Sequence, residues 1–426
     1  MSAAPPTTVQ VADGGPARPA PGRGAFWLVG LTVVAFLSAS SAPSPLYVVY
    51  QQRWHFSELT LTAVFASYAI ALLLALVTVG GLSDFVGRRP VLLAALALEA
   101  TSMVLFLTAG DVPVLVLARV VQGLATGTAT GVASAALVDL QPPGTQLAGV
   151  VNGAASTGGL ALGALGAGLL VQLAPAATTL VFVVLLVAFV ALVVPLWFLP
   201  ETVRRRPGAL ASLTPRLAVP PQARATFLAV LPIVVATWSM GALYLSLGPS
   251  IAVVDLGLTS HLAGALVITL FTGSGAVASV AARHRPARPV MLAGSAVLAA
   301  GTSVAVLGVQ TGVPAVFFLG TVVAGTGFGT GFLGAFRTLA VLAGPEERAE
   351  LLAAVYVVNY LAFSLPAIAA GLLVPHLGLQ RTATGYGVVV VVLALVVLLV
   401  AATQRLAARR QVAQSQVAHR QVARRS

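Results

Sequence analysis

Long apolar runs separated by short polar turns constrain this chain more than any other feature of the sequence. Residues 61–79 and 91–109 form two such runs, each close to the ~20 residues that an α-helix needs to cross a bilayer. Only 8% of the 426 residues are charged and 58% are hydrophobic, whereas a soluble domain is about 25% charged. The sequence therefore predicts an all-α membrane protein with many spans.

Twelve hydrophobic spans can be counted along the chain, and a longer polar segment divides them into six and six. The spans run over residues 25–50, 59–82, 90–109, 113–140, 146–173, 178–199, 225–250, 260–282, 289–309, 313–342, 349–374 and 382–403. We expect a disordered N-terminal tail (1–24), an N-terminal bundle (25–199), a linker (200–224), a C-terminal bundle (225–403) and a basic cytoplasmic C-terminal tail (404–426). We expect the C-terminal tail to be solvated and disordered, and the alternative is that it lies against anionic lipid.

The distribution of arginine predicts the orientation. The net charge is +12, and cytoplasmic loops of membrane proteins carry an excess of basic residues. With the N-terminus in the cytoplasm, the outer loops hold only Arg53 and Arg381, and Arg119 lies within a span. We therefore expect a multi-pass protein of the plasma membrane with both termini cytoplasmic. The scattered arginines form no continuous basic face, so we expect no nucleic-acid partner.

The two halves of the chain resemble each other weakly. The stretch that begins Arg89-Pro-Val-Leu-Leu-Ala matches the one that begins Arg288-Pro-Val-Met-Leu-Ala, and the glycine-rich run from Val120 matches the run from Val322. The two matches have nearly the same offset, and the alternative is chance similarity among apolar helices. Parallel repeats of six spans are a feature of several transporter folds, so we expect two bundles related by a pseudo-two-fold axis.

The turn from Gly80 to Pro90, with the sequence GGLSDFVGRRP, combines glycines with an acid and two bases. Asp84 lies at one helix end, and Arg88 and Arg89 begin the next helix. A carboxylate and guanidinium groups held close form charge-assisted hydrogen bonds. The alternative is an ordinary basic cytoplasmic loop, which needs arginines but not this spacing.

This turn resembles the helix 2–3 motif of the major facilitator superfamily, G-x-L-(A/S)-D-(R/K)-x-G-R-(R/K), at Gly80, Leu82, Ser83, Asp84, Gly87, Arg88 and Arg89. Phe85 stands where that family usually has a base. The resemblance implies the fold of that family, with two six-helix bundles and a central cavity. It also implies that the turn is a latch that holds the halves together while the cytoplasmic side is closed.

The fourth span carries a second similarity to the family. Arg119, Gln122, Gly123 and Gly127 resemble the pattern R-x-x-Q-G-x-x-x-G, which implies a buried arginine linked to proton transfer. Glu99 lies about ten residues into the third span, or ~15 Å deep at 1.5 Å per residue. Buried ionisable residues in membranes are costly and usually functional.

We hypothesise that Glu99 or a substrate carboxylate pairs with Arg119, and that Glu99 carries a proton. A pair would lower the penalty of burying either charge. The alternatives are a static ion pair, or a Glu99 that lies near a lipid-facing defect.

Polar and aromatic residues in several spans are candidates for a substrate cavity. Pro43 and Pro45 are expected to break the first helix near its outer end. The candidates are Tyr47, Gln122, Asn152, Trp238, Tyr244, Tyr356 and Asn359. Packing or anchoring at the membrane interface is the alternative for each aromatic residue.

Other classes of function lack their motifs. The chain has no cysteine, no ligand-spaced cluster for a metal and no G-x-x-x-x-G-K-(S/T) loop for ATP. We therefore expect no cofactor, no metal site and no enzymatic activity. The fifth span carries Gly159 and Gly163 but has Ala164 where the exporter branch of the family has proline. This departure weakens the inference of antiport.

Taken with the resemblance, these features predict a monomeric secondary transporter that exports a small hydrophobic or cationic compound by alternating access, coupled to protons. Two alternatives stay open. One is an uptake symporter for a small nutrient on the same fold, and the other is a membrane sensor or scaffold that transports nothing.

Overall fold

The computed structural model describes residues 23–145, 147–214, 218–342 and 348–423, and within these ranges it contains helices and turns but no strand. Twelve of the described helices are long and apolar enough to cross a membrane. This confirms the predicted number of spans and the all-α fold. Each predicted span overlaps one of these helices.

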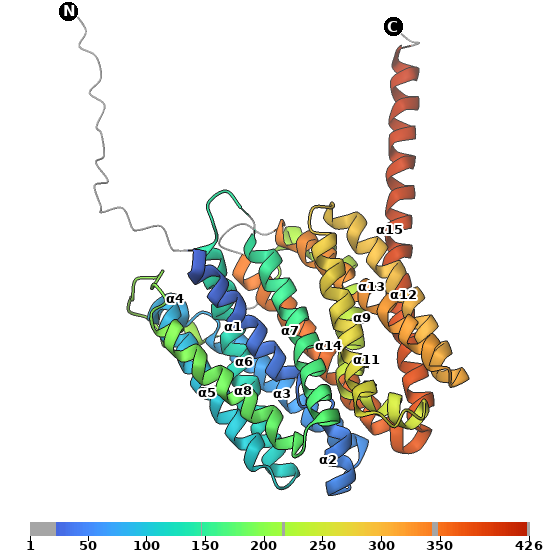
Figure 1. Cartoon of the computed structure of the whole chain (residues 1–426). Helices are drawn as coiled ribbons and strands as arrows, with labels where there is room; N and C mark the ends of the chain where they lie inside the picture. Colours follow the sequence, from blue (N-terminus) through green and yellow to red (C-terminus); the bar gives the residue numbers. More distant parts are fainter. Residues whose placement is uncertain (1–22, 146, 215–217, 343–347, 424–426) are drawn as a thin grey trace, which may run out of the picture.

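Helices α1 to α8 form the first half of the molecule and α9 to α15 the second (Figure 1). In the first half they are α1 (Arg23–Ser41), α2 (Tyr47–Trp54), α3 (Glu58–Val79), α4 (Ser83–Val86), α5 (Arg88–Thr108), α6 (Val112–Leu140), α7 (Leu147–Leu173) and α8 (Ala177–Trp197). In the second half they are α9 (Pro221–Ser246), α10 (Gly248–Ser250), the π-helical turn η2 (Ile251–Asp255), α11 (His261–Ala281), α12 (Ala287–Thr311), α13 (Pro314–Ala340), α14 (Arg348–Leu377) and α15 (Leu379–Ala423). The linker contains the 3-10 turn η1 (Ala211–Leu213).

Local sequence signals set several helix ends. The side chain of Ser57 accepts a hydrogen bond from the backbone N–H of Thr60 and caps α3. Asp111 caps α6 in the same way through the N–H of Val114. Such caps satisfy backbone donors that have no partner within the helix. The prolines after Ser41 end α1, as predicted, so the expected span 25–50 consists of α1, a turn and α2.

The expectations about the two ends of the chain have different outcomes. The predicted disorder of the tail after residue 404 is wrong, because α15 continues as one helix to Ala423 and projects beyond the body (Figure 1). Residues 1–22 of the expected disordered tail lie outside the described part of the chain, and Arg23 and Gly24 already belong to α1.

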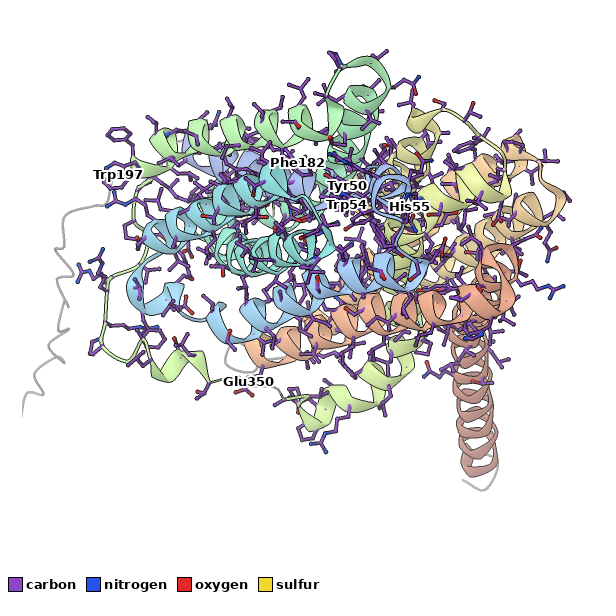
Figure 2. All side chains as sticks on the ribbon, turned by 90° about the horizontal axis from the view of Figure 1, so that it is seen from below. Tyr50, Trp54, His55, Phe182, Trp197 and Glu350 are labelled. Carbon is purple, nitrogen blue, oxygen red and sulfur yellow. The ribbon has the colours of Figure 1, made fainter. Side chains whose placement is uncertain are left out.

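The ends of the long helices form two opposite faces of the molecule. We call the face that carries the start of α1, the end of α8 and the start of α9 the linker face, and the other the opposite face (Figure 1). Figure 2 views the opposite face and labels Tyr50 and Trp54 of α2, close to the junction of the two halves. The two rings stack with centroids 4.7 Å apart.

The two halves contact each other from the middle of the molecule to the opposite face. The ring of Phe65 on α3 lies 4.9 Å from that of Phe363 on α14, and Ser260 donates a hydrogen bond of 3.2 Å to Gln172 across α11 and α7. The halves are therefore in contact from the middle of the molecule to the opposite face.

Candidate functional site

The break after α1 exposes backbone carbonyls inside the first half. In a continuous helix, the carbonyl of Ala39 would accept from the N–H of residue 43, but that residue is proline and has none. The side chain of Gln122 donates to this carbonyl instead at 3.0 Å. Arg119 donates to the neighbouring carbonyl of Ser40 at 2.9 Å. The prolines thereby create the acceptors that hold two polar side chains of α6.

Arg119 is fully buried and is held by neutral groups. Its Nε donates to the Tyr47 hydroxyl at 2.6 Å and its Nη1 to Oε1 of Gln122 at 2.6 Å. The guanidinium carbon also lies 5.3 Å and 5.2 Å from the ring centres of Tyr47 and Tyr68, where aromatic faces attract a cation. Its Nη2 is buried and has no hydrogen-bond partner among the residues that the structure describes.

Glu99 is also fully buried, and it does not pair directly with Arg119. Gln122 lies between them: its Nε2 donates to Oε1 of Glu99 at 3.2 Å, while its Oε1 accepts from Arg119. Thr126 donates to the other carboxylate oxygen at 3.5 Å. The hypothesis of a direct pair therefore changes to an acid and a base joined through one amide. We call Glu99, Gln122 and Arg119 the buried triad.

The turn after α3 forms a compact charged cluster at the linker face. Arg88 contacts Asp84 at 2.6 Å and Asp139, at the end of α6, at 3.1 Å. Its Nη1 also donates to Ser83 at 2.6 Å. The expected contact of Asp84 with Arg88 is present, and Asp139 is a partner that sequence reasoning missed. Among the described residues, the side-chain ion pairs of Arg88 lie within the first half.

Glu201, just beyond α8, binds the start of α5 and was also missed. Its carboxylate accepts from the backbone N–H groups of Arg88 at 2.8 Å and Arg89 at 3.2 Å. An anion at a helix N-terminus neutralises unpaired donors and the positive end of the helix dipole. Gly87 lies beside it with φ +111°, and a Cβ at this position would overlap the carboxylate. Arg89 donates to the carbonyl of Trp197 at 3.1 Å.

Phe85, the departure from the family motif, has a basic partner from the linker. The guanidinium carbon of Arg206 lies 4.9 Å from the centre of its ring. The backbone N–H of Arg206 donates to the Phe85 carbonyl at 3.1 Å, and its Nε donates to the Asp84 carbonyl at 3.3 Å. The linker therefore supplies a base beside the position where the motif usually has one. Gly80 of the same turn lies against Gly131 of α6.

The residues predicted to line a substrate cavity lie in different parts of the structure. Tyr47 and Gln122 belong to the network around the buried triad. Asn152 on α7 accepts from Ser134 of α6 at 3.2 Å. Trp238 is close to Phe332, Tyr360 and Phe363, with centroids 5.5 Å, 5.1 Å and 5.8 Å away.

Tyr356 and Asn359 lie on α14 near this aromatic cluster. The Tyr356 ring stacks on that of Tyr360 at 6.5 Å. Asn359 is fully buried, and neither atom of its amide has a hydrogen-bond partner among the described residues. The indole N–H of Trp238 is likewise buried without a partner. Unpaired polar groups of this kind are costly unless water or a ligand pairs with them.

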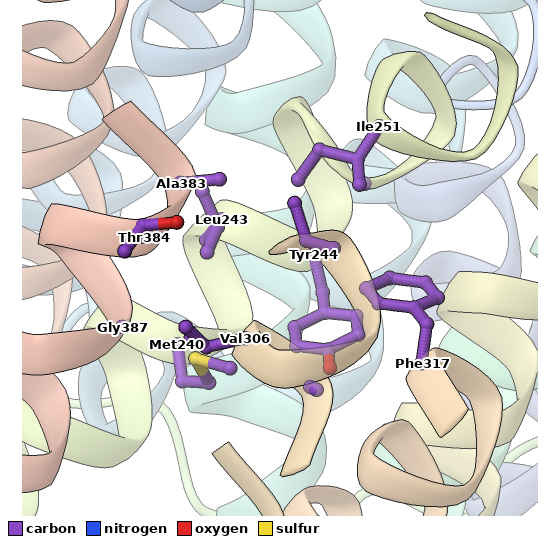
Figure 3. Close-up of a pocket in the computed structure, with 12 residues that line it drawn as sticks. Met240, Leu243, Tyr244, Ile251, Val306, Phe317, Ala383, Thr384 and Gly387 are labelled. Atoms are coloured by element: carbon purple, nitrogen blue, oxygen red, sulfur yellow. The ribbon is translucent and has the colours of Figure 1, made fainter. Parts of the chain in front are cut away.

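Tyr244 lies elsewhere, inside the second half. Its hydroxyl pairs with Thr321 at 3.0 Å and its ring stacks on Phe271 at 4.2 Å. The adjoining cavity, shown in Figure 3 with Met240, Tyr244 and Phe317 on its wall, measures about 20 Å³. That volume has room for about one water molecule. The packing interpretation of Tyr244 therefore fits this structure better than a substrate contact.

Comparisons with known proteins identify the family. The sequence profile of the Major Facilitator Superfamily matches residues 28–284, which is more than half of the chain. This chain belongs to the major facilitator superfamily. It is therefore a transporter of the secondary-transporter kind, with a multi-pass membrane fold. No curated protein sequence matches it.

Solved structures of other transporters share the fold. The human organic anion transporter MFSD10 (TETRAN) is 16% identical with a TM-score of 0.64, over 89% of this chain and 100% of that one. The xylose transporter XylE from E. coli, in a partially occluded inward-open conformation, is 15% identical with a TM-score of 0.67, over 87% and 95%. A bacterial homologue of the human lysosomal transporter Spinster, inward-facing and occupied, is 13% identical with a TM-score of 0.67, over 91% and 98%.

Proposed function

We propose that this chain exports a small hydrophobic or cationic compound across the plasma membrane by alternating access, in exchange for protons. The observation that carries the proposal is the buried triad, in which Glu99 and Arg119 are both fully buried and joined through Gln122. In its ionised form, Glu99 compensates the charge of the guanidinium. Protonation of Glu99 would leave that charge without its compensation in a water-poor environment, and a rearrangement of α1, α5 and α6 would relieve it.

The closed contacts at the opposite face support one stage of the cycle. If the linker face is cytoplasmic, as the arginine bias predicts, these contacts close the outer side, and we infer that this conformation is inward-facing. In this conformation the ion pairs of the charged cluster of Asp84 and Arg88 lie within the first half. The cluster then does not hold the two halves together. Closing the cytoplasmic side would bring this cluster against the second half and stabilise the outward-open state.

The aromatic cluster around Trp238 supports the substrate class. Aromatic faces bind apolar groups and attract cations, and Trp238, Phe332, Tyr360 and Phe363 come from three helices of the second half. The amide of Asn359 adds a donor and an acceptor that have no partner among the described residues. A compound with an apolar or cationic body could contact the aromatic rings, and one neutral polar group on it could pair with the amide of Asn359.

Proton coupling is testable with purified protein and a panel of hydrophobic cations. We expect substrate addition to release protons from wild-type protein in which Glu99 is protonated. We expect at least tenfold fewer protons from Glu99→Gln, because the amide cannot ionise. In vesicles, the variant is expected to lose uphill transport but to keep substrate counterflow. Glu58→Gln, at the start of α3, is the matched control. Full proton-coupled transport by Glu99→Gln would remove Glu99 from the mechanism.

An anionic substrate is the second candidate, and the unpaired Nη2 of Arg119 favours it. A substrate carboxylate would complete the hydrogen bonds of the guanidinium; one of the similar structures is an organic anion transporter. Substrate-gradient assays in oriented vesicles separate export of cations from uptake or exchange of anions. Absence of counterflow for every compound would instead favour a sensor or scaffold.

Membrane orientation is directly testable because the chain has no cysteine. A single cysteine introduced at Ser212 in the linker is expected to react only after cells are permeabilised. One introduced at Gly110, between α5 and α6, is expected to react from outside with a membrane-impermeant maleimide. The reverse pattern would overturn the proposed orientation and the assignment of the linker face to the cytoplasm.

A further inference from the structure

A cavity of about 690 Å³ lies inside the second half at the linker face, separate from the buried triad. Its volume falls within the roughly 300–1,000 Å³ typical of ligand pockets. Four helices form its wall. The lining residues include Ala229 of α9, Arg288 and Met291 of α12, Arg337 of α13, and Val397 and Gln404 of α15.

The polar residues of this cavity lie at the ends of membrane spans. Arg288 is in the first turn of the span Ala287–Thr311, Arg337 is in the last turn of Pro314–Ala340, and Gln404 ends the span Leu379–Gln404. Lipid headgroups occupy this depth in a bilayer. The rest of the wall, from Val230 and Met291 to Val397, extends along apolar parts of the spans.

Both arginines lack an acidic partner among the residues that the structure describes. Arg288 donates to Oε1 of Gln404 at 3.0 Å. Arg337 donates to the carbonyls of Arg283 and Arg285 at 3.1 Å and 3.0 Å. These neutral acceptors hold the guanidinium groups in place but do not balance their charge. No described carboxylate lines the cavity.

We propose that this cavity binds an anionic phospholipid, with its phosphate on Arg288 and Arg337 and one acyl chain between α9, α12, α13 and α15. Basic pockets between membrane helices on the cytoplasmic side suit such headgroups. The apolar wall below the arginines fits a hydrocarbon chain, which a free anion would leave unused. A bound lipid would connect the ends of four helices and stabilise the second half.

The test uses full-length purified protein in detergent. We expect 1-palmitoyl-2-oleoyl-phosphatidylglycerol to bind at least tenfold more tightly than the matching phosphatidylcholine, as measured by native mass spectrometry. We also expect it to raise the melting temperature. Arg288→Gln with Arg337→Gln is expected to lose this preference, because both phosphate contacts are removed. The control is the double variant Arg204→Gln with Arg205→Gln, at two exposed linker arginines outside the cavity. It removes the same amount of charge and is expected to retain the preference for phosphatidylglycerol.

Two further variants distinguish a bound lipid from a free anion and separate loss of charge from misfolding. Ala229→Phe, which fills the cavity but keeps both arginines, is expected to weaken phosphatidylglycerol binding at least fivefold and to leave binding of glycerol phosphate unchanged. Arg288→Lys with Arg337→Lys keeps the charges and is expected to retain most of the preference. The melting temperature of each variant without lipid shows whether it is folded.

Three results would overturn the proposal. The first is an unchanged preference in a folded Arg288→Gln and Arg337→Gln variant. The second is an equal loss in the Arg204→Gln and Arg205→Gln control, which would indicate general attraction to a basic face. The third is glycerol phosphate binding as tightly as the lipid, with no effect of Ala229→Phe on either, which would indicate a site for a free anion.

Discussion

Replacing Arg119 with glutamine is expected to destabilise the protein by about 3 kcal/mol, because the ionised form of Glu99 then has no compensating charge in the buried triad. Both side chains are fully buried, and Gln122 connects them. A second substitution, Glu99→Gln, is expected to recover most of the loss, since the core of the first half is then neutral. The measurement is the melting temperature in detergent, which is expected to fall by about 5 °C in the single variant.

A double-mutant cycle over these two positions measures the coupling between them. We expect the double variant to be clearly more stable than the sum of the single changes predicts. Strictly additive losses would contradict the electrostatic connection through Gln122 and would leave Glu99 and Arg119 as independent structural residues. Gln122→Leu, which removes the connecting amide, is expected to destabilise the protein alone and to reduce the coupling.

Replacing Gly87 with alanine is expected to cost about 2–4 kcal/mol and to reduce transport strongly. The backbone at Gly87 has φ +111° and ψ 153°, a conformation that is essentially confined to glycine, and forcing another residue into it costs about 1–3 kcal/mol. The added Cβ would also displace the Glu201 carboxylate from the start of α5. That displacement exposes the N–H groups of Arg88 and Arg89 and disturbs the position of the charged cluster.

Gly153→Ala provides the control for this substitution. Gly153 lies within α7 and a Cβ there meets nothing within 4 Å, so alanine is expected to be neutral or slightly stabilising. Thermal unfolding and counterflow are measured for both variants. A Gly87→Ala protein with wild-type stability and transport would contradict the roles assigned to this glycine and to Glu201.

Much of the fold was predictable because the bilayer constrains the length and composition of each span. The break after Ser41 was also predictable, since Pro43 removes a backbone donor wherever it occurs in a helix. The helical continuation of α15 to Ala423 was not expected, because the repeated arginines there were interpreted as a solvated tail. A hydrophobic pattern gives no information about a polar segment that extends an existing helix.

The candidate site was predictable in its members but not in its connections. Glu99 and Arg119 stood out because charged residues within spans are rare. That Gln122 would lie between them depends on how α5 and α6 are rotated about their axes. Glu201 and Arg88 are far apart in sequence, and only the return of α8 to the linker face brings them together. Asp139 was missed for the same reason.

The sequence by itself determined the twelve spans, the two halves and the few charges that the membrane must contain, because each depends on local composition and on the cost of burying polar groups. Only the tertiary structure decided which partners those charges have, at which face the halves are closed, and that a cavity with two arginines opens within the second half. These features depend on the rotation and packing of helices that are distant in the chain. Hydrophobic periodicity does not specify that packing when most faces of a membrane helix are apolar.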